Sequence, residues 1–118
     1  MNDRFRFRKP VFSKDKKFKK FVYFELFDMP AFTARSSDII GKEEQCTGLK
    51  DKNGRLIYEG DIVKFKISSI KCVGAVRWDE RTGGWLKDKT GQPLHTYIKS
   101  VEVIGNIHEN PELLEWEK

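Results

Sequence analysis

Residues 46–65, CTGLKDKNGRLIYEGDIVKF, decide the fold of this chain. Asn53 and Gly54 predict a β-hairpin, because a two-residue type I′ turn requires positive φ at both central positions and these residue types tolerate it. A second turn is expected at residues 58–61, where Gly60 is free to adopt a left-handed conformation. The extended segments between the turns indicate a small antiparallel sheet rather than a binding loop.

Alternation of apolar and polar residues continues downstream of these turns. Residues 62–67 place Val63 and Phe65 on one face and lysines on the other, as expected of a strand with one face toward a core. Residues 71–78 and 85–87 repeat the pattern around a turn at 79–84, and a last strand is expected over residues 97–107. No amphipathic helix of useful length separates these segments, so the predicted fold class is mainly β, a small and strongly bent antiparallel barrel.

The C-terminal residues predict a different element. Asn110 is a good N-cap and Pro111 suits the first helical position, so a short terminal helix is expected from about residue 111. Its apolar residues either cap one end of the barrel or contact a second subunit. A small domain with a limited core gains stability by association, so a homo-oligomer is expected.

The N-terminal arm carries the excess positive charge. Residues 1–20 hold nine Lys and Arg against two Asp, or +7, so the other 98 residues come to −2. Alternation places Arg4, Arg6 and Arg8 on one face of an N-terminal hairpin and Phe5 and Phe7 on the other. Three interpretations stay open: a solvated reverse side of core phenylalanines, a surface for nucleic-acid phosphates, or a contact for an acidic protein. The candidate contact residues are Arg4, Arg6, Arg8, Lys9, Lys16, Lys17, Lys19 and Lys20.

Two tryptophans form a second candidate surface. Trp78 and Trp85 flank the turn at 79–84, where they stack either as a core pair or as an outward platform for a protein partner. The candidate protein interface is Trp78, Trp85, Leu113, Leu114 and Trp116.

Catalytic and metal-binding signals are weak. The chain has no nucleophile elbow, phosphate-binding glycine loop or metalloprotease motif, so no catalytic residues and no cofactor are predicted. Cys46, Cys72, His95 and His108 lack the close spacing of zinc ligands, and the two histidines are expected on the surface. The carboxylates at predicted turns are expected to support the backbone there rather than to act as acid and base; they are Glu59, Asp61, Asp79 and Glu80.

Localisation is inferred from two absences. The chain has no apolar run of 18 residues and its first residues lack an apolar signal core, so a cytoplasmic protein is expected. Cys46 and Cys72 are then reduced thiols that act as buried hydrophobic residues.

Several motifs resemble the YopX family of phage and prophage proteins. They are TGLKDKNG at 47–54, IYEGDIV at 57–63, EVIGNI at 102–107 and ENPELL at 109–114, with a basic and aromatic start at 4–8. The resemblance implies a phage-encoded protein in the cytoplasm of a bacterial host, with an SH3-like barrel and an oligomeric state, and it implies no activity. Cys46 stands where the family has an aromatic residue, which favours a hydrophobic role for this cysteine.

The predicted organisation follows from these patterns. Residues 1–45 form a basic and aromatic hairpin module with its connector, and residues 46–118 form the SH3-like barrel with a short C-terminal helix. The predicted function is a non-catalytic protein-interaction or assembly module with a phage or host partner. The alternative is nucleic-acid binding by the basic N-terminal hairpin. Salt separates the two, because phosphate contacts weaken steeply as salt rises and an apolar interface does not.

Overall fold

A computed structural model describes residues 5–25, 37–81, 83–87, 92–96 and 98–115. The candidate residues Arg4 and Trp116 lie outside the described residues. The fold is mainly β, with two antiparallel sheets, and the second sheet curls into a half-barrel. Among the described residues no helix reaches seven residues, and none has the length and apolarity needed to cross a bilayer.

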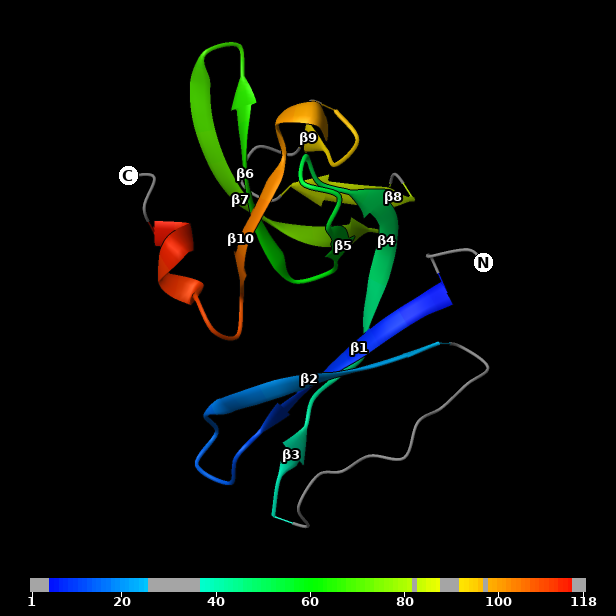
Figure 1. Ribbon diagram of the computed structural model, residues 1–118, viewed down its shortest axis with the longest axis vertical. Helices are drawn as coiled ribbons and strands as arrows, with labels where there is room; N and C mark the ends of the chain where they lie inside the picture. Colours follow the sequence, from blue (N-terminus) through cyan, green and yellow to red (C-terminus); the bar gives the residue numbers. More distant parts are fainter. Residues whose placement is uncertain (1–4, 26–36, 82, 88–91, 97, 116–118) are drawn as a thin grey trace.

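Each sheet contains five strands (Figure 1). The first has the order β2-β1-β4-β5, with β3 also paired to β1. Its strands are β1 (Arg6–Phe12), β2 (Phe18–Glu25), β3 (Ile39–Ile40), β4 (Glu44–Lys50) and β5 (Leu56–Tyr58). The second has the order β10-β6-β7-β8-β9. Its strands are β6 (Asp61–Ile67), β7 (Ile70–Asp79), β8 (Gly84–Lys87), β9 (Gln92–Pro93) and β10 (Glu102–Asn106).

The hairpin predicted around Asn53 and Gly54 is confirmed as β4 and β5, but its predicted turn type is wrong. Gly54 has a φ of 82°, whereas Asn53 is not among the residues with positive φ, which a type I′ turn would require. The Asp51 carboxylate organises the turn instead, because its Oδ1 accepts the backbone N–H groups of Asn53 and Arg55, both at 2.9 Å. The second turn is as predicted, with Gly60 at a φ of 89°.

The alternation predicted for β6 is confirmed. Val63 and Phe65 are buried, at 0% and 2% exposure, while Lys64 and Lys66 are exposed. The core lies inside the curled second sheet, against β5 and the segment before β10. Its buried members are Ile57, Val63, Phe65, Cys72, Val76, Leu94, Val101 and Val103. Burying each large aliphatic or aromatic side chain contributes about 1.5–3 kcal/mol.

The last predicted strand starts too early. A 3-10 helix, η2 (Ile98–Ser100), precedes β10, so only the second half of residues 97–107 pairs with β6. Near the C-terminus the structure has a second 3-10 helix, η3 (Pro111–Glu115), at the position of the expected terminal helix. The side-chain oxygen of Asn110 accepts the backbone N–H of Asn106 at 3.3 Å, which ties this segment to the end of β10.

In Figure 1, β1, β2 and β3 form one end of the molecule, while β5 of the same sheet lies beside the second sheet. Strand β4 links these two parts of the first sheet, because its start pairs with β1 at Arg8 and Glu44 and its continuation pairs with β5, which packs on the second sheet. The β6–β7 hairpin projects from the opposite end (Figure 1). The predicted N-terminal hairpin is therefore present, and it packs against the rest of the chain where β1 meets β4.

Candidate functional site

Arg8 lies at the junction between the two sheets. Its side chain is 1% exposed, and its Nε donates to Oε1 of Glu44 at 2.7 Å. Its Nη2 lies 2.9 Å from Oδ1 of Asp61 and donates to the backbone carbonyl of Glu59 at 3.2 Å. Arg8 therefore connects β1 of the first sheet with β4 and with the turn that leads into β6.

Two aromatic rings complete the surroundings of this guanidinium. The Arg8 Cζ lies 3.9 Å from the centre of the Phe21 ring and 4.9 Å from that of Tyr58. Cation–π contacts of a desolvated guanidinium contribute about 2 kcal/mol. The planar, permanently charged fork of arginine suits such a site, because it binds two carboxylates and stacks on rings at the same time.

Burial and charge oppose each other in this cluster. Burial acts to lower the pKa of Arg8, but the carboxylates of Asp61 and Glu44 outweigh it and raise that pKa above its ordinary value. Burial raises the pKa of Asp61, against the neighbouring Arg8 charge and the Tyr58 backbone N–H. Oδ2 of Asp61 accepts that N–H at 2.8 Å, so Asp61 has the turn-supporting role predicted from the sequence as well as the ion pair.

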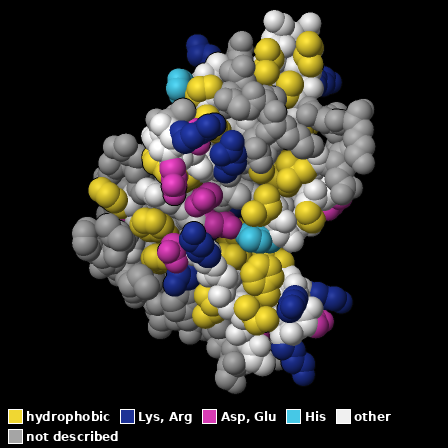
Figure 2. Space-filling model, turned by 180° about the vertical axis from the view of Figure 1, so that it is seen from behind, with side chains coloured by type: hydrophobic (Ala, Val, Ile, Leu, Met, Phe, Trp, Pro, Cys, Tyr) yellow, Lys and Arg dark blue, Asp and Glu magenta, His cyan; other side chains and the backbone are white. Residues whose placement is uncertain are grey.

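Glu44 contacts a histidine on its other side. Nε2 of His108 lies 2.5 Å from Oε2 of Glu44, and the His108 side chain is 18% exposed. The imidazole packs against Phe12, Phe18 and Phe21, with ring centres 5.5, 6.0 and 5.9 Å away. His108 is therefore half-buried at the surface where it was predicted, because its ring packs between β1, β2 and the segment after β10. Figure 2 shows one face on which acidic side chains, a histidine and hydrophobic side chains lie next to one another.

A groove of about 590 Å³ opens beside this cluster. Its apolar lining comes from β1, from β7 and from the C-terminal segment: Pro10, Phe12, Ala75, Val76, Ile107 and Leu114. Its polar lining contains charges of both signs: Lys42, Glu43, Glu44, Glu59, Arg77 and His108. This groove, called the junction groove below, is the candidate functional site, because it combines apolar walls with polar groups of both signs in one concave surface.

The basic face predicted for the N-terminal hairpin is only partly present. The expectation that Arg8 lies on that face in contact with solvent is wrong, because this face of β1 packs against β4 and β6 at Arg8. Arg6 is partly exposed and lies 3.7 Å from Glu25, and Lys9 lies 5.8 Å from the centre of the Phe24 ring. The exposed lysines of the hairpin are Lys14, Lys16, Lys17, Lys19 and Lys20, and Lys19 binds Asp38 at 3.1 Å.

The tryptophan pair was predicted as a core pair or as an outward platform, and each tryptophan has a different position. Trp78 and Trp85 are cross-strand partners in β7 and β8, and their rings meet edge to face with centres 5.1 Å apart. Trp85 packs on the core while Trp78 is 44% exposed, so the pair is neither fully internal nor an outward platform. Leu113 and Leu114 are half-buried, and Leu114 lines the junction groove.

Cys46, Cys72 and His95 do not line the junction groove. Cys46 and Cys72 are buried thiols, as predicted, and His95 is exposed. Among the described residues no three His, Cys, Asp or Glu side chains gather in an arrangement that could hold a metal ion. Glu44 was not predicted as a site residue, because it precedes the predicted sheet segment that starts at residue 46 and no pattern in the sequence indicates that it is buried.

Comparisons with known proteins agree with this architecture. A family model described as "YopX protein" matches residues 12–115. The chain is similar in fold to protein EF1440 from Enterococcus faecalis, known from its crystal structure, with 24% sequence identity and a TM-score of 0.50. That match covers 92% of this chain and 97% of the other. No curated protein matches the chain.

Proposed function

The chain belongs to the YopX family, and we propose that it is a non-catalytic assembly module that self-associates through the junction groove. The proposal includes a phage or prophage accessory role in the cytoplasm of a bacterial host. It also includes assignment of the curled second sheet to the SH3-like barrels, since short, strongly bent antiparallel strands around one small core are typical of that type.

Exposed isoleucines beside the groove carry this proposal. Ile107 lines the groove and is 39% exposed. Ile39 and Ile40, at 42% and 43%, directly precede Gly41, which also lines it. Isolated exposed apolar residues are common, but several beside an apolar groove are typical of an interaction site.

The charges of the groove favour a protein surface as its occupant. Lys42 and Arg77 lie on the same lining as Glu43 and Glu59, so the groove has no single sign of charge that would select a polyanion. A second copy of the chain carries the same apolar residues and charges of both signs, and a two-fold interface brings this same surface of each copy together.

Sedimentation velocity over a range of protein concentrations tests self-association. The wild type is expected to sediment as an oligomer, and Ile107→Lys as a monomer, because a lysine ammonium at the centre of an apolar contact would be desolvated. Ile70→Lys is the matched control, since Ile70 is 67% exposed at the start of β7 and lies outside the groove lining. Oligomer formation should hardly respond to salt. A wild type that is monomeric throughout, or equal effects of both substitutions, refutes the proposal.

Nucleic-acid binding by the basic N-terminal hairpin is the second candidate function. The observation that favours it is the exposure of Lys16, Lys17 and Lys20 beside the turn between β1 and β2. Fluorescence anisotropy with labelled DNA and RNA at two salt concentrations tests it, because several phosphate contacts lose affinity steeply as salt rises. Loss of saturable binding in a Lys16→Gln, Lys17→Gln, Lys20→Gln variant supports this candidate, and unchanged binding refutes it.

A further inference from the structure

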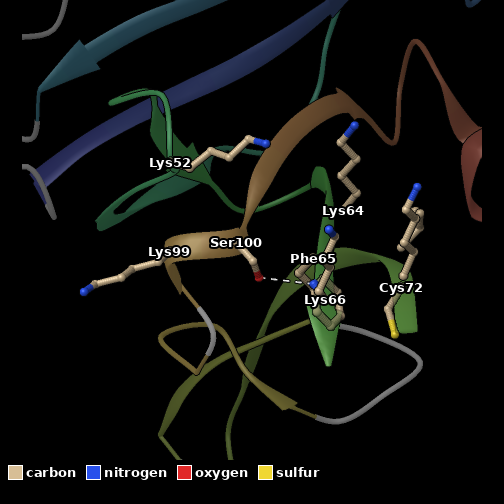
Figure 3. Close-up of a pocket in the computed structure, with 9 residues that line it drawn as sticks. Lys52, Lys64, Phe65, Lys66, Cys72, Lys99 and Ser100 are labelled. Atoms are coloured by element: carbon tan, nitrogen blue, oxygen red, sulfur yellow. Dashed lines mark hydrogen bonds between the residues drawn. The ribbon is translucent and has the colours of Figure 1, made fainter. Parts of the chain in front are cut away.

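A second concave surface lies on the half-barrel, away from the junction groove and the N-terminal hairpin. It is a hollow of about 440 Å³ between β6, β7 and η2 (Figure 3). Five lysines line it: Lys52, Lys64, Lys66, Lys71 and Lys99. The rest of its lining is Phe65, Cys72, Val73 and Ser100. We call it the lysine pocket. Its concentration of positive charge is unexpected, because residues 21–118 have a net charge of −2.

Two of these lysines face each other across the hairpin. Lys66 and Lys71 are directly opposite in the β6–β7 ladder, where like charges destabilise a sheet. Neither has a carboxylate within ion-pair distance in the part of the chain that the structure describes. The hairpin therefore holds a repulsive pair on an exposed surface, and a bound anion would relieve that repulsion.

Lys64, unlike Lys66 and Lys71, has an opposite charge across the sheet. It lies opposite Glu102 in the neighbouring ladder, and the two side chains form an ion pair at 3.3 Å. Lys52 meets the same carboxylate at 3.5 Å. Within the described residues Glu102 is the one carboxylate that pairs with any of the five lysines, so the pocket keeps a strong excess of positive charge.

The lysines are spread out rather than directed at one point. Figure 3 shows the Lys99 side chain directed away from Lys64 and Lys66. A site for one small anion would have donors that converge on it, whereas separated ammonium groups suit several phosphates in succession. Ammonium groups act as point charges without a fixed geometry, which fits backbone contacts that do not depend on sequence.

The shape of the pocket favours a strand with unpaired bases. Lys66 and Lys71 are exposed and line the pocket, while Phe65 and Val73, both buried, form part of its wall. A single strand has nucleoside units free to enter such a hollow, whereas a duplex keeps its bases paired and stacked inside.

We propose that the lysine pocket binds single-stranded nucleic acid, with backbone phosphates on Lys64, Lys66 and Lys71 and one nucleoside unit in the hollow. The site uses none of the residues of the junction groove and none of the N-terminal hairpin. It is therefore independent of self-association, and it is a different site from the second candidate function.

Fluorescence anisotropy of the full chain with a labelled strand of about 12 nucleotides tests the proposal, since single-strand sites of small folds span roughly 4–16 nucleotides. The test variant is Lys66→Gln with Lys71→Gln. The matched control is Lys50→Gln with Arg81→Gln, which removes the same charge from exposed positions outside the pocket. A third variant, Lys16→Gln with Lys17→Gln, tests the second candidate function. Circular dichroism and thermal unfolding establish that all three variants are folded.

The expected result follows from counterion release. Each phosphate contact contributes about 0.7 to the slope of log K against log salt for single strands, so loss of two contacts lowers the slope by about 1.4. At about 0.1 M salt the double variant should therefore bind roughly 25-fold more weakly than the wild type, if the two bind equally at about 1 M salt. The Lys50 and Arg81 control variant is expected to bind within about twofold of the wild type, since neither side chain contacts the strand.

Four outcomes overturn the proposal. The first is no saturable binding by the wild type at low salt. The second is equal loss in the Lys66 and Lys71 variant and in the Lys50 and Arg81 control, which indicates diffuse electrostatic attraction. The third is loss in the Lys16 and Lys17 variant alone, which supports the N-terminal hairpin instead. The last is equal competition by inorganic phosphate, by duplex DNA or by polyglutamate, because the pocket would then recognise a phosphate, a duplex or an acidic protein.

Discussion

Arg8→Ala should weaken the attachment of the N-terminal sheet to the half-barrel. The substitution leaves the carboxylates of Glu44 and Asp61 buried without the guanidinium that lies 2.7 and 2.9 Å from them. Removing one partner of a buried ion pair costs about 3–5 kcal/mol, because the remaining charge keeps its desolvation penalty. Loss of the contacts with the Phe21 and Tyr58 rings acts in the same direction. We therefore expect a loss of about 4 kcal/mol in the free energy of unfolding.

Urea unfolding followed by circular dichroism measures this loss, and Arg6→Ala is the matched control. The Arg6 side chain is 43% exposed and lies 3.7 Å from Glu25, so its removal should cost less than about 1 kcal/mol. Arg8→Lys should fall between the two, because an ammonium keeps the charge but lacks the fork that reaches both carboxylates. In thermal unfolding a loss of about 4 kcal/mol corresponds to a decrease in Tm of roughly 15 °C.

Amide hydrogen exchange shows where the stability is lost. Exchange should accelerate more in β1 and β2 than in β6 and β7, since Arg8 is the residue that joins the first pair to the turn before β6. A cost of less than about 1 kcal/mol for Arg8→Ala would falsify the inference that this cluster holds the two sheets together, because that is the value of an exposed pair.

Further predictions concern single residues of the turns and the core. Burial acts to raise the pKa of Asp51, but three backbone N–H donors outweigh it and lower that pKa. The contribution of Asp51 to the free energy of unfolding should therefore be fully present above about pH 4 and should be lost as the pH falls through the lower folded-state pKa. Urea midpoints should show this decline in the wild type but not in Asp51→Asn. Burial lowers the pKa of Lys87 to about 8. Because the unfolded chain, with a lysine pKa of about 10.4, then binds more protons, stability should rise from about pH 8 to about pH 10, and Lys87→Met should flatten this rise. Gly54→Ala and Gly60→Ala should each cost about 1 kcal/mol through positive φ, and thermal unfolding should show a larger loss for Gly60, whose added Cβ would lie 3.1 Å from the Glu44 carboxylate.

The candidate site was only partly predictable from the sequence. Leu114 was a predicted interface residue and lines the junction groove, because an apolar residue in a short terminal segment must pack on the barrel or on a neighbour. Glu44 and His108 were missed as partners, since they are 64 residues apart and no local pattern connects them. The lysine pocket was missed for the same reason, because Lys52 and Lys99 come from separate segments on either side of β6 and β7.

The sequence by itself determined the hairpins of this protein and the faces of its strands. Turns at Gly54 and Gly60 and the alternation along β6 depend on backbone conformation and on neighbouring residues, so they can be read from a few consecutive positions. Only the tertiary structure decided which face of β1 meets the half-barrel. Alternation groups Arg6 with Arg8, but burial of Arg8 depends on carboxylates that lie 36 and 53 residues further along the chain. Long-range charge pairing therefore separates a structural arginine from a surface one.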